Sequence, residues 1–185
     1  MNHEFRMYVG PMFGGKTTRM LSQVERYSYM GEDTLVFKPA IDERYDNASI
    51  VTHTGNTHPA ILVNEGIEIE RIVASALGSD PSVVAVDEAF MIEGSGDALV
   101  NLFRRGHTVL ISSLQLSSDG SPYKEVQKMF PFATHVEVCP AIDQFSKQNA
   151  YYTEKFGGRS DHGIEVGGAE MYRPRDWIGF FGSDR

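Results

Sequence analysis

The sequence predicts an α/β fold in which a parallel β-sheet is flanked by helices. Short apolar runs of strand length alternate along the chain with stretches whose apolar residues repeat at helical spacing. The run SVVAVDE at 82–88 is apolar up to two terminal acids, which is typical of a strand buried on both faces. With 185 residues, 41% of them hydrophobic, the chain can bury such a core as one domain or as one domain with a small appendage.

The elements follow in order. A strand over 5–9 leads into a glycine-rich segment, and apolar residues three or four positions apart predict a helix over 17–30, which Gly31 ends. The polar stretch 40–59 should be mostly loop, with room for a short hairpin. Further strands are expected over 34–39, 60–63, 82–88, 107–114 and 136–138, and further helices over 67–77 and 98–105.

The tail of the chain has a different character. After about Cys139 the sequence offers only short strand candidates flanked by glycines, over 151–156 and 163–166. We therefore predict a main α/β domain over 1–138 and a small C-terminal lobe over 139–185.

Composition excludes several classes of protein. A formal net charge of −8 argues against the broad basic face that binds nucleic acid. No apolar run approaches the roughly 18 residues of a membrane span, and the first ten residues lack the pattern of a secretory signal. Cys139 is the single cysteine, so no intramolecular disulfide can form. We expect a cytoplasmic protein with no nucleic-acid or membrane partner.

The segment GPMFGGKT at 10–17 matches G-x-x-x-x-G-K-[ST] between a predicted strand and a predicted helix. Its glycines let backbone N–H groups point at phosphate oxygens beside the positive end of the helix, so we predict a P-loop. Lys16 can reach the β- and γ-phosphates, and the Thr17 hydroxyl can ligate Mg²⁺. The alternative is a glycine-rich turn that holds a lysine by chance. The predicted nucleotide-binding residues are Gly10, Pro11, Met12, Phe13, Gly14, Gly15, Lys16, Thr17 and Asp87.

Two acids end the buried run at 82–88. A carboxylate in the position of Asp87 is where such folds hold Mg²⁺, so Thr17 and Asp87 are the predicted magnesium ligands. In a regular extended chain Glu88 would point to the opposite side of the strand. Both acids could instead form a solvated strand end. The pair predicts nucleotide binding without identifying an acceptor.

Five segments together resemble the cellular-type (type II) thymidine kinases. They are GPMFGGKT, VFKPAIDERY at 36–45, VTHTG at 51–55, VAVDEAF at 84–90 and GGAEMY at 167–172, in the order of that family. The resemblance implies a P-loop (RecA-like) fold with a lasso-type substrate loop in the small lobe. It also implies ATP and Mg²⁺ as cofactors, thymidine or a related deoxynucleoside as acceptor in nucleotide salvage, and a homo-tetramer.

The resemblance further implies residue roles. Glu88 would be the general base for the 5′-hydroxyl of the nucleoside, while Arg44 and Lys16 would balance charge on the transferring phosphoryl group. The loop over 166–172 would close over the base, with Tyr172 close to the sugar. Arg44 could instead form a surface ion pair, and Tyr172 could be a core residue of the small lobe. The implied substrate-binding residues are Phe90, Tyr123, Val166, Gly167, Gly168, Ala169, Glu170, Met171 and Tyr172.

The chain also departs from the family pattern. Phe90 stands where the family usually has glutamine, and Ser118 where it usually has an aromatic residue; Phe90 and Tyr123 are the candidates to compensate. Cys139 has no partner three positions on, so we predict no zinc site. We expect an apolar cluster to stabilise the small lobe instead, from Tyr151, Tyr152, Phe156, Trp177, Phe180 and Phe181.

Three alternatives to a thymidine kinase stay open. The first keeps the chemistry but uses a modified or different pyrimidine nucleoside. The second is a P-loop ATPase that acts without a small acceptor. The third is a binding protein descended from a kinase, in which Phe90 and Ser118 mark a reshaped pocket.

Overall fold

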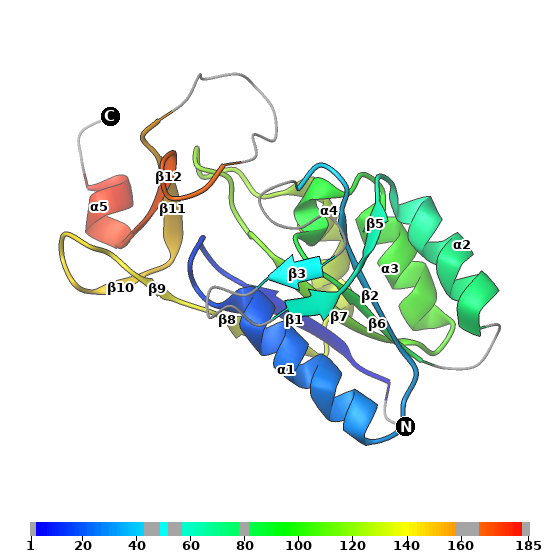
Figure 1. Cartoon of the computed structure of the whole chain (residues 1–185). Helices are drawn as coiled ribbons and strands as arrows, with labels where there is room; N and C mark the ends of the chain where they lie inside the picture. Colours follow the sequence, from blue (N-terminus) through cyan, green and yellow to red (C-terminus); the bar gives the residue numbers. More distant parts are fainter. Residues whose placement is uncertain (1–2, 43–48, 52–56, 78–81, 158–166, 183–185) are drawn as a thin grey trace.

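A parallel sheet of six strands lies at the centre of the computed structural model, which describes residues 3–42, 49–51, 57–77, 82–157 and 167–182. The strand order is β5-β2-β6-β7-β1-β8, and every neighbouring pair is parallel (Figure 1). The predicted α/β fold with a parallel sheet is therefore confirmed. The strands are β1 (Phe5–Val9), β2 (Thr34–Pro39), β5 (Ile61–Val63), β6 (Val83–Val86), β7 (Thr108–Ser113) and β8 (His135–Val138).

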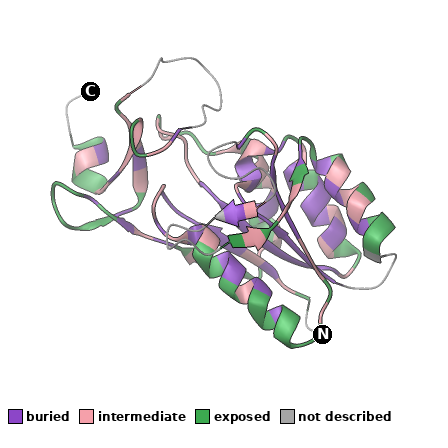
Figure 2. Ribbon diagram, viewed as in Figure 1, coloured by how far each residue is buried: buried purple, intermediate pink, exposed green. Residues whose placement is uncertain are grey.

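Helices cover both faces of this sheet, as two separate apolar clusters show. Helix α1 (Lys16–Tyr29) buries Met20, Leu21 and Val24 in one cluster with alternate side chains of the central strands. The other helices contribute to a second cluster on the opposite face. Figure 2 shows buried strands between helices whose outer sides are exposed. These other helices are α2 (Gly66–Leu77), α3 (Ser95–Arg104) and α4 (Lys124–Met129).

The carboxyl ends of the central strands meet at one edge of the sheet. Val9 is level with Ser113, and Val86 is level with Phe37 and Ile111. The segments that follow β1 and β6, together with the end of β7, therefore lie close together. In an open parallel sheet this edge is where ligands bind.

The chain after β8 forms two antiparallel pairs beside the main sheet (Figure 1). The sequence predicted β11 over 151–156 but missed β9, β10, β12 and α5, all of them short. The second predicted strand, over 163–166, lies outside the described residues. The elements are β9 (Ala141–Ile142), β10 (Asn149–Ala150), β11 (Tyr152–Lys155), β12 (Tyr172–Arg175) and α5 (Trp177–Phe181).

Aromatic rings do cluster here, although not all of those expected. The rings of Tyr152 and Phe180 stack with centroids 5.0 Å apart, and Phe181 packs edge-on against both. Trp177 lies 5.9 Å from Phe181, whereas Phe156 contacts the guanidinium of an arginine instead. The predicted apolar cluster is confirmed for four of its six members.

A buried carboxylate ties this region together. Asp143 accepts hydrogen bonds from the backbone N–H groups of Phe145 at 2.8 Å and Asp176 at 3.0 Å, and it lies 3.5 Å from Arg175 Nε. It thereby joins the β9–β10 turn to the start of α5. Within the described residues, no three His, Cys, Asp or Glu side chains come together in a way that could hold a metal ion.

The remaining elements agree with the expected loop region. Strands β3 (Ser49–Val51) and β4 (Thr57–Pro59) form the antiparallel hairpin for which the sequence left room. Across the ranges that the structure describes, no helix combines the length and apolarity needed to cross a bilayer.

Candidate active site

The glycine-rich loop joins β1 to α1 in a backbone conformation that depends on glycine. Gly10 and Gly15 have φ values of +145° and +73°. A Cβ atom on Gly10 would come within 2.4 Å of the Cys139 carbonyl oxygen, and one on Gly14 within 2.3 Å. The loop can lie against the chain after β8 only because these positions carry no side chain.

This loop and the start of α1 offer a positive environment for phosphate. No side chain caps the amino terminus of α1 by a hydrogen bond, and its first turn contains no acid. Its first N–H groups and the positive end of its dipole therefore suit an anion. The buried Lys16 ammonium lies over the loop, with Nζ 2.7 Å from the Pro11 carbonyl oxygen. The predicted phosphate-binding residues are thus assembled in one place.

A cluster of oxygen atoms lies beside the loop. Asp87 directly follows β6 and is buried; its Oδ1 accepts hydrogen bonds from Thr17 Oγ1 at 2.9 Å and Ser112 Oγ at 2.5 Å. Burial and the neighbouring Glu88 raise the pKa of Asp87 to about 6, although both hydrogen bonds act against this rise. A carboxylate, together with the hydroxyl that ends a phosphate loop, provides oxygen ligands suited to Mg²⁺.

Ser112 was not among the predicted site residues. Its position at the carboxyl end of β7, a strand adjacent to β6, was the signal that could have found it. Lys38 and Asp42, in the segment KPAIDERY, are both buried, at the end of β2 and just after it. Lys38 Nζ lies 3.5 Å from the Ser49 carbonyl oxygen and so faces the β3–β4 hairpin.

Glu88 has a backbone conformation that the sequence did not predict. The strand ends at Val86, and Glu88 has φ 49° and ψ 45°, in the left-handed region, before a 3₁₀ turn at Ala89–Met91. The expected extended chain at 82–88 is therefore wrong at its end. A residue with a side chain in this region costs about 1–2 kcal/mol, and such strain is often found at functional sites. The Glu88 Oε2 atom is buried.

Two aromatic rings, those of Phe90 and Tyr123, are in contact near Glu88. The rings of Phe90 and Tyr123 pack with centroids 4.4 Å apart, at an interplanar angle of 41°. Burial raises the pKa of the Tyr123 hydroxyl, and the nearby Tyr172 and Glu88 raise it further. The structure therefore brings together Phe90, Tyr123, Tyr172 and Glu88, which come from three separate segments.

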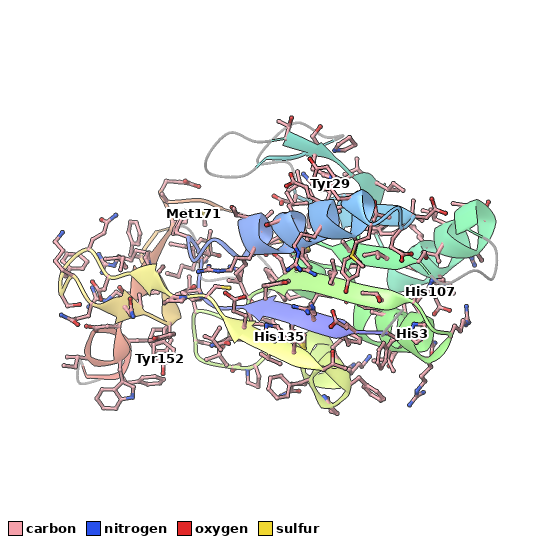
Figure 3. All side chains as sticks on the ribbon, turned by 90° about the horizontal axis from the view of Figure 1, so that it is seen from below. His3, Tyr29, His107, His135, Tyr152 and Met171 are labelled. Carbon is pink, nitrogen blue, oxygen red and sulfur yellow. The ribbon has the colours of Figure 1, made fainter. Side chains whose placement is uncertain are left out.

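The segment 167–171 forms a compact turn that leads into β12. The N–H groups of Met171 and Tyr172 both donate to the Gly168 carbonyl oxygen, at 3.1 and 3.0 Å, and Gly168 N donates to Glu170 Oε1 at 2.7 Å. Gly167 is buried. Figure 3 shows Met171 beside the amino-terminal end of α1. Two predicted site residues, Arg44 and Val166, lie outside the described residues.

Comparison with known proteins decides the family. A family model described as thymidine kinase matches residues 3–175, nearly the whole chain. The chain belongs to the thymidine kinase family. It is 34% identical over 176 residues to a thymidine kinase of Pyrobaculum aerophilum, with 90% of this chain and 92% of the relative covered.

Two further members of the thymidine kinase family show similar agreement. The chain is 31% identical over 173 residues to a thymidine kinase of Thermococcus kodakarensis, covering 90% of this chain and 88% of the relative. It is 32% identical over 140 residues to one of Mesoplasma florum, covering 75% and 69%. The resemblance in the five sequence segments is therefore confirmed at the level of the family.

Proposed function

We propose that this chain is a thymidine kinase of nucleotide salvage, which transfers the γ-phosphoryl group of ATP to the 5′-hydroxyl of thymidine. The observation that carries the proposal is the change of direction between Asp87 and Glu88. Asp87 belongs to the oxygen cluster beside the phosphate loop, and Glu88 follows it in a left-handed turn, close enough for its charge to raise the pKa of both Asp87 and Tyr123. Donor and acceptor groups can therefore meet at adjacent residues.

The donor half consists of the phosphate loop 10–17 and Asp87. Backbone N–H groups of the loop bind phosphate oxygens, and Lys16 supplies a positive charge to the β- and γ-phosphates. Thr17 and Asp87 fit as Mg²⁺ ligands because their oxygen atoms already converge, 2.9 Å apart. When bound, Mg²⁺ neutralises charge on the phosphoryl oxygens. Arg44 stays a predicted contributor to the same charge balance.

The acceptor half consists of Glu88, the Phe90–Tyr123 pair and the loop ending in 167–172. Glu88 takes the proton of the 5′-hydroxyl as the oxygen attacks phosphorus, a role worth about 10²–10⁴-fold in rate. Phe90 and Tyr123 supply apolar surface for the base, and backbone groups of the loop read its polar edge. Val166 stays a predicted member of this loop.

A different or modified pyrimidine is a second candidate acceptor. The contact between the rings of Phe90 and Tyr123 favours this candidate. Phe90 stands where the family pattern has glutamine, and Ser118 stands where it has an aromatic residue. A pocket lined in this way could prefer a base with an altered substituent. The lack of zinc, the homo-tetramer, the cytoplasmic location and the domain division at 138/139 all stay predictions.

The direct test is phosphoryl transfer from labelled ATP to a panel of nucleosides. We expect labelled thymidine monophosphate, and the ratio of kcat/KM between thymidine and 5-substituted deoxyuridines will separate the two candidate acceptors. ATP hydrolysis without transfer to any nucleoside would contradict the proposal and favour an ATPase. ATP and nucleoside binding without turnover would favour a binding protein.

A further inference from the structure

The chain after β8 holds the phosphate loop at two points. Cys139 N donates to the Val9 carbonyl oxygen at 2.7 Å, and its own carbonyl fills the space beside Gly10 and Gly14. Farther along, the hydroxyl of Thr153 accepts a hydrogen bond of 3.1 Å from the N–H of Met12, inside the loop. Thr153 is 4% exposed, so little water can replace this bond.

Thr153 is also close to the acceptor loop. It lies in β11, which pairs with β12 so that Thr153 is opposite Pro174 and Lys155 opposite Tyr172. One residue beyond β11, Phe156 N donates to the Met171 carbonyl oxygen at 2.9 Å. Thr153, which accepts the hydrogen bond from Met12, is therefore three residues along the chain from Phe156, which is bonded to the residue before Tyr172.

The hairpin between these two contacts is reinforced by side chains. Arg173 Nε lies 2.6 Å from Glu154 Oε2, and its guanidinium lies over the Phe156 ring, 5.0 Å from the centroid. Side chains thus hold neighbouring positions of β11 and β12 together in addition to their backbone pairing. Thr153 and Tyr172 therefore belong to one strand pair that side chains reinforce.

Met12 also packs on the core of the main sheet. Its side chain packs on the apolar cluster that includes Phe90, and Tyr123 packs on the same cluster. Its backbone N–H is bound by Thr153, and it lies within the phosphate loop. Met12 therefore joins the phosphate loop to the apolar cluster that contains Phe90.

We propose that Thr153 is a positioning residue that couples the two substrates through its hydrogen bond to Met12. The inference rests on the proposed function, since it needs an acceptor bound under the 167–172 loop. A bound triphosphate orders the phosphate loop and so fixes the position of the Met12 N–H. Through its hydrogen bond to Thr153, Met12 then favours the position of β11 in which the loop 167–172 is held in place. By linkage, the nucleoside improves triphosphate affinity by the same factor. A single neutral hydrogen bond supports a factor of about five.

The test measures thymidine affinity by calorimetry, with and without a saturating non-hydrolysable ATP analogue and Mg²⁺. In the wild type we expect affinity to rise about fivefold when the analogue is bound. Thr153→Val, which keeps the shape of the side chain but removes the hydroxyl, should bring this factor close to one. Thr153→Ser, which restores a hydroxyl, should recover it.

Thr134→Val is the matched control. The Thr134 hydroxyl accepts a hydrogen bond of 2.9 Å from Phe5 N, which is the same kind of bond at the opposite end of β1. Loss of this bond should lower the free energy of unfolding without changing the factor by which the ATP analogue improves thymidine affinity. An unchanged factor in Thr153→Val, or a factor of one in the wild type, would overturn the inference even if thymidine is phosphorylated. Absence of thymidine turnover in the wild type would overturn the proposed function, and this inference with it.

A measurement on the wild type keeps the inference testable if Thr153→Val does not fold. Thymidine added alone should slow hydrogen exchange of the Met12 amide several-fold. When the nucleoside fixes β11 and β12, the Met12 N–H stays bonded to Thr153 for more of the time and exchanges less often. The amide of Phe5, bonded to Thr134 in the same way, should not respond. Equal responses at both amides, or none at Met12, would contradict the coupling.

Discussion

Asp87 Oδ1 lies 2.9 Å from the Thr17 hydroxyl, although 70 positions separate the two residues in the sequence. The contact joins the first turn of α1 to the end of β6, and Ser112 completes the cluster from β7. Glu88 follows Asp87 in the left-handed region, and its charge raises the pKa of both Asp87 and Tyr123. One sharp turn therefore separates the group proposed for magnesium from the group proposed for proton transfer.

Glu88→Gln should separate catalysis from binding. The amide keeps the size of the side chain but cannot accept the proton of the 5′-hydroxyl, so we expect kcat to fall by about 10²–10⁴-fold. ATP affinity, measured by calorimetry, should stay within about twofold because the loop 10–17 is untouched. Glu93→Gln, at an exposed position five residues on, is the control and should keep wild-type kcat. A Glu88→Gln enzyme with normal kcat would exclude this residue as the base.

Ser112→Ala should weaken the site for the metal ion. The variant removes one of the two side-chain hydrogen bonds that orient the Asp87 carboxylate. A bond of this kind is worth about 1 kcal/mol, so the Mg²⁺ concentration for half-maximal activity should rise about fivefold. Ser113→Ala, whose hydroxyl instead donates to the Leu114 carbonyl oxygen, should leave the Mg²⁺ dependence unchanged. Equal Mg²⁺ dependence in both variants would show that Ser112 does not support the ion.

Gly14→Ala should damage the phosphate loop itself. The new Cβ would meet the Cys139 carbonyl oxygen at 2.3 Å, so either the loop or the chain after β8 must move. We expect the free energy of unfolding to fall by about 1–3 kcal/mol and ATP affinity to fall about tenfold or more.

Gly31→Ala is a useful comparison for this loss. Gly31 has φ +82° with open space around it, so alanine there costs about 1–2 kcal/mol of backbone strain without a clash. Its ATP affinity should equal that of the wild type. If Gly14→Ala bound ATP as tightly as Gly31→Ala, the loop would not be the phosphate site.

How much of this could be predicted from the sequence depends on how local each signal is. Strands of the main sheet and helices such as α1 have apolar residues at a fixed period, and their type and order were predicted from it. Strand β12 reads YRPR and has no such pattern; its Arg173 is held by Glu154 and Phe156, which are distant in sequence. Only tertiary contacts could have revealed it.

The site shows the same division. The motif 10–17 predicted the phosphate loop, because its glycines and lysine are contiguous in sequence. Ser112 was not predicted, because its contact with Asp87 depends on the register of β6 and β7. Helix α5 did have a local signal in the sequence, because Asp176 is a residue type favoured at a helix N-cap. In the structure its carboxylate accepts a hydrogen bond of 2.6 Å from Gly179 N.

Asp143→Asn should destabilise the region around α5. The substitution removes the charge that faces Arg175 and weakens the hydrogen bonds from Phe145 and Asp176. Bonds to a charged group are worth about 1.5–3 kcal/mol, so the free energy of unfolding in urea should fall by about that amount. Asp119→Asn is the control, because that carboxylate accepts its hydrogen bonds from Ser117 and Ser121 within an exposed turn. Similar losses in both variants would show that Asp143 has no special role.

The final prediction concerns acid stability and His107. The side chain is buried, with Nδ1 2.8 Å from the Ser82 hydroxyl, and Figure 3 shows it at the same end of the sheet as His3. Burial lowers the pKa of His107, and Arg105 and His3 lower it further, whereas a histidine in the unfolded chain titrates near 6.5. Below about pH 6.5 the unfolded chain therefore binds a proton at His107, whereas the folded protein keeps this histidine neutral. The free energy of unfolding consequently falls as the pH falls toward the pKa of His107 in the folded protein. His107→Asn should lose this part of the decline between pH 7.5 and 5.5 in urea denaturation. A decline as steep as in the wild type would show that another group is responsible.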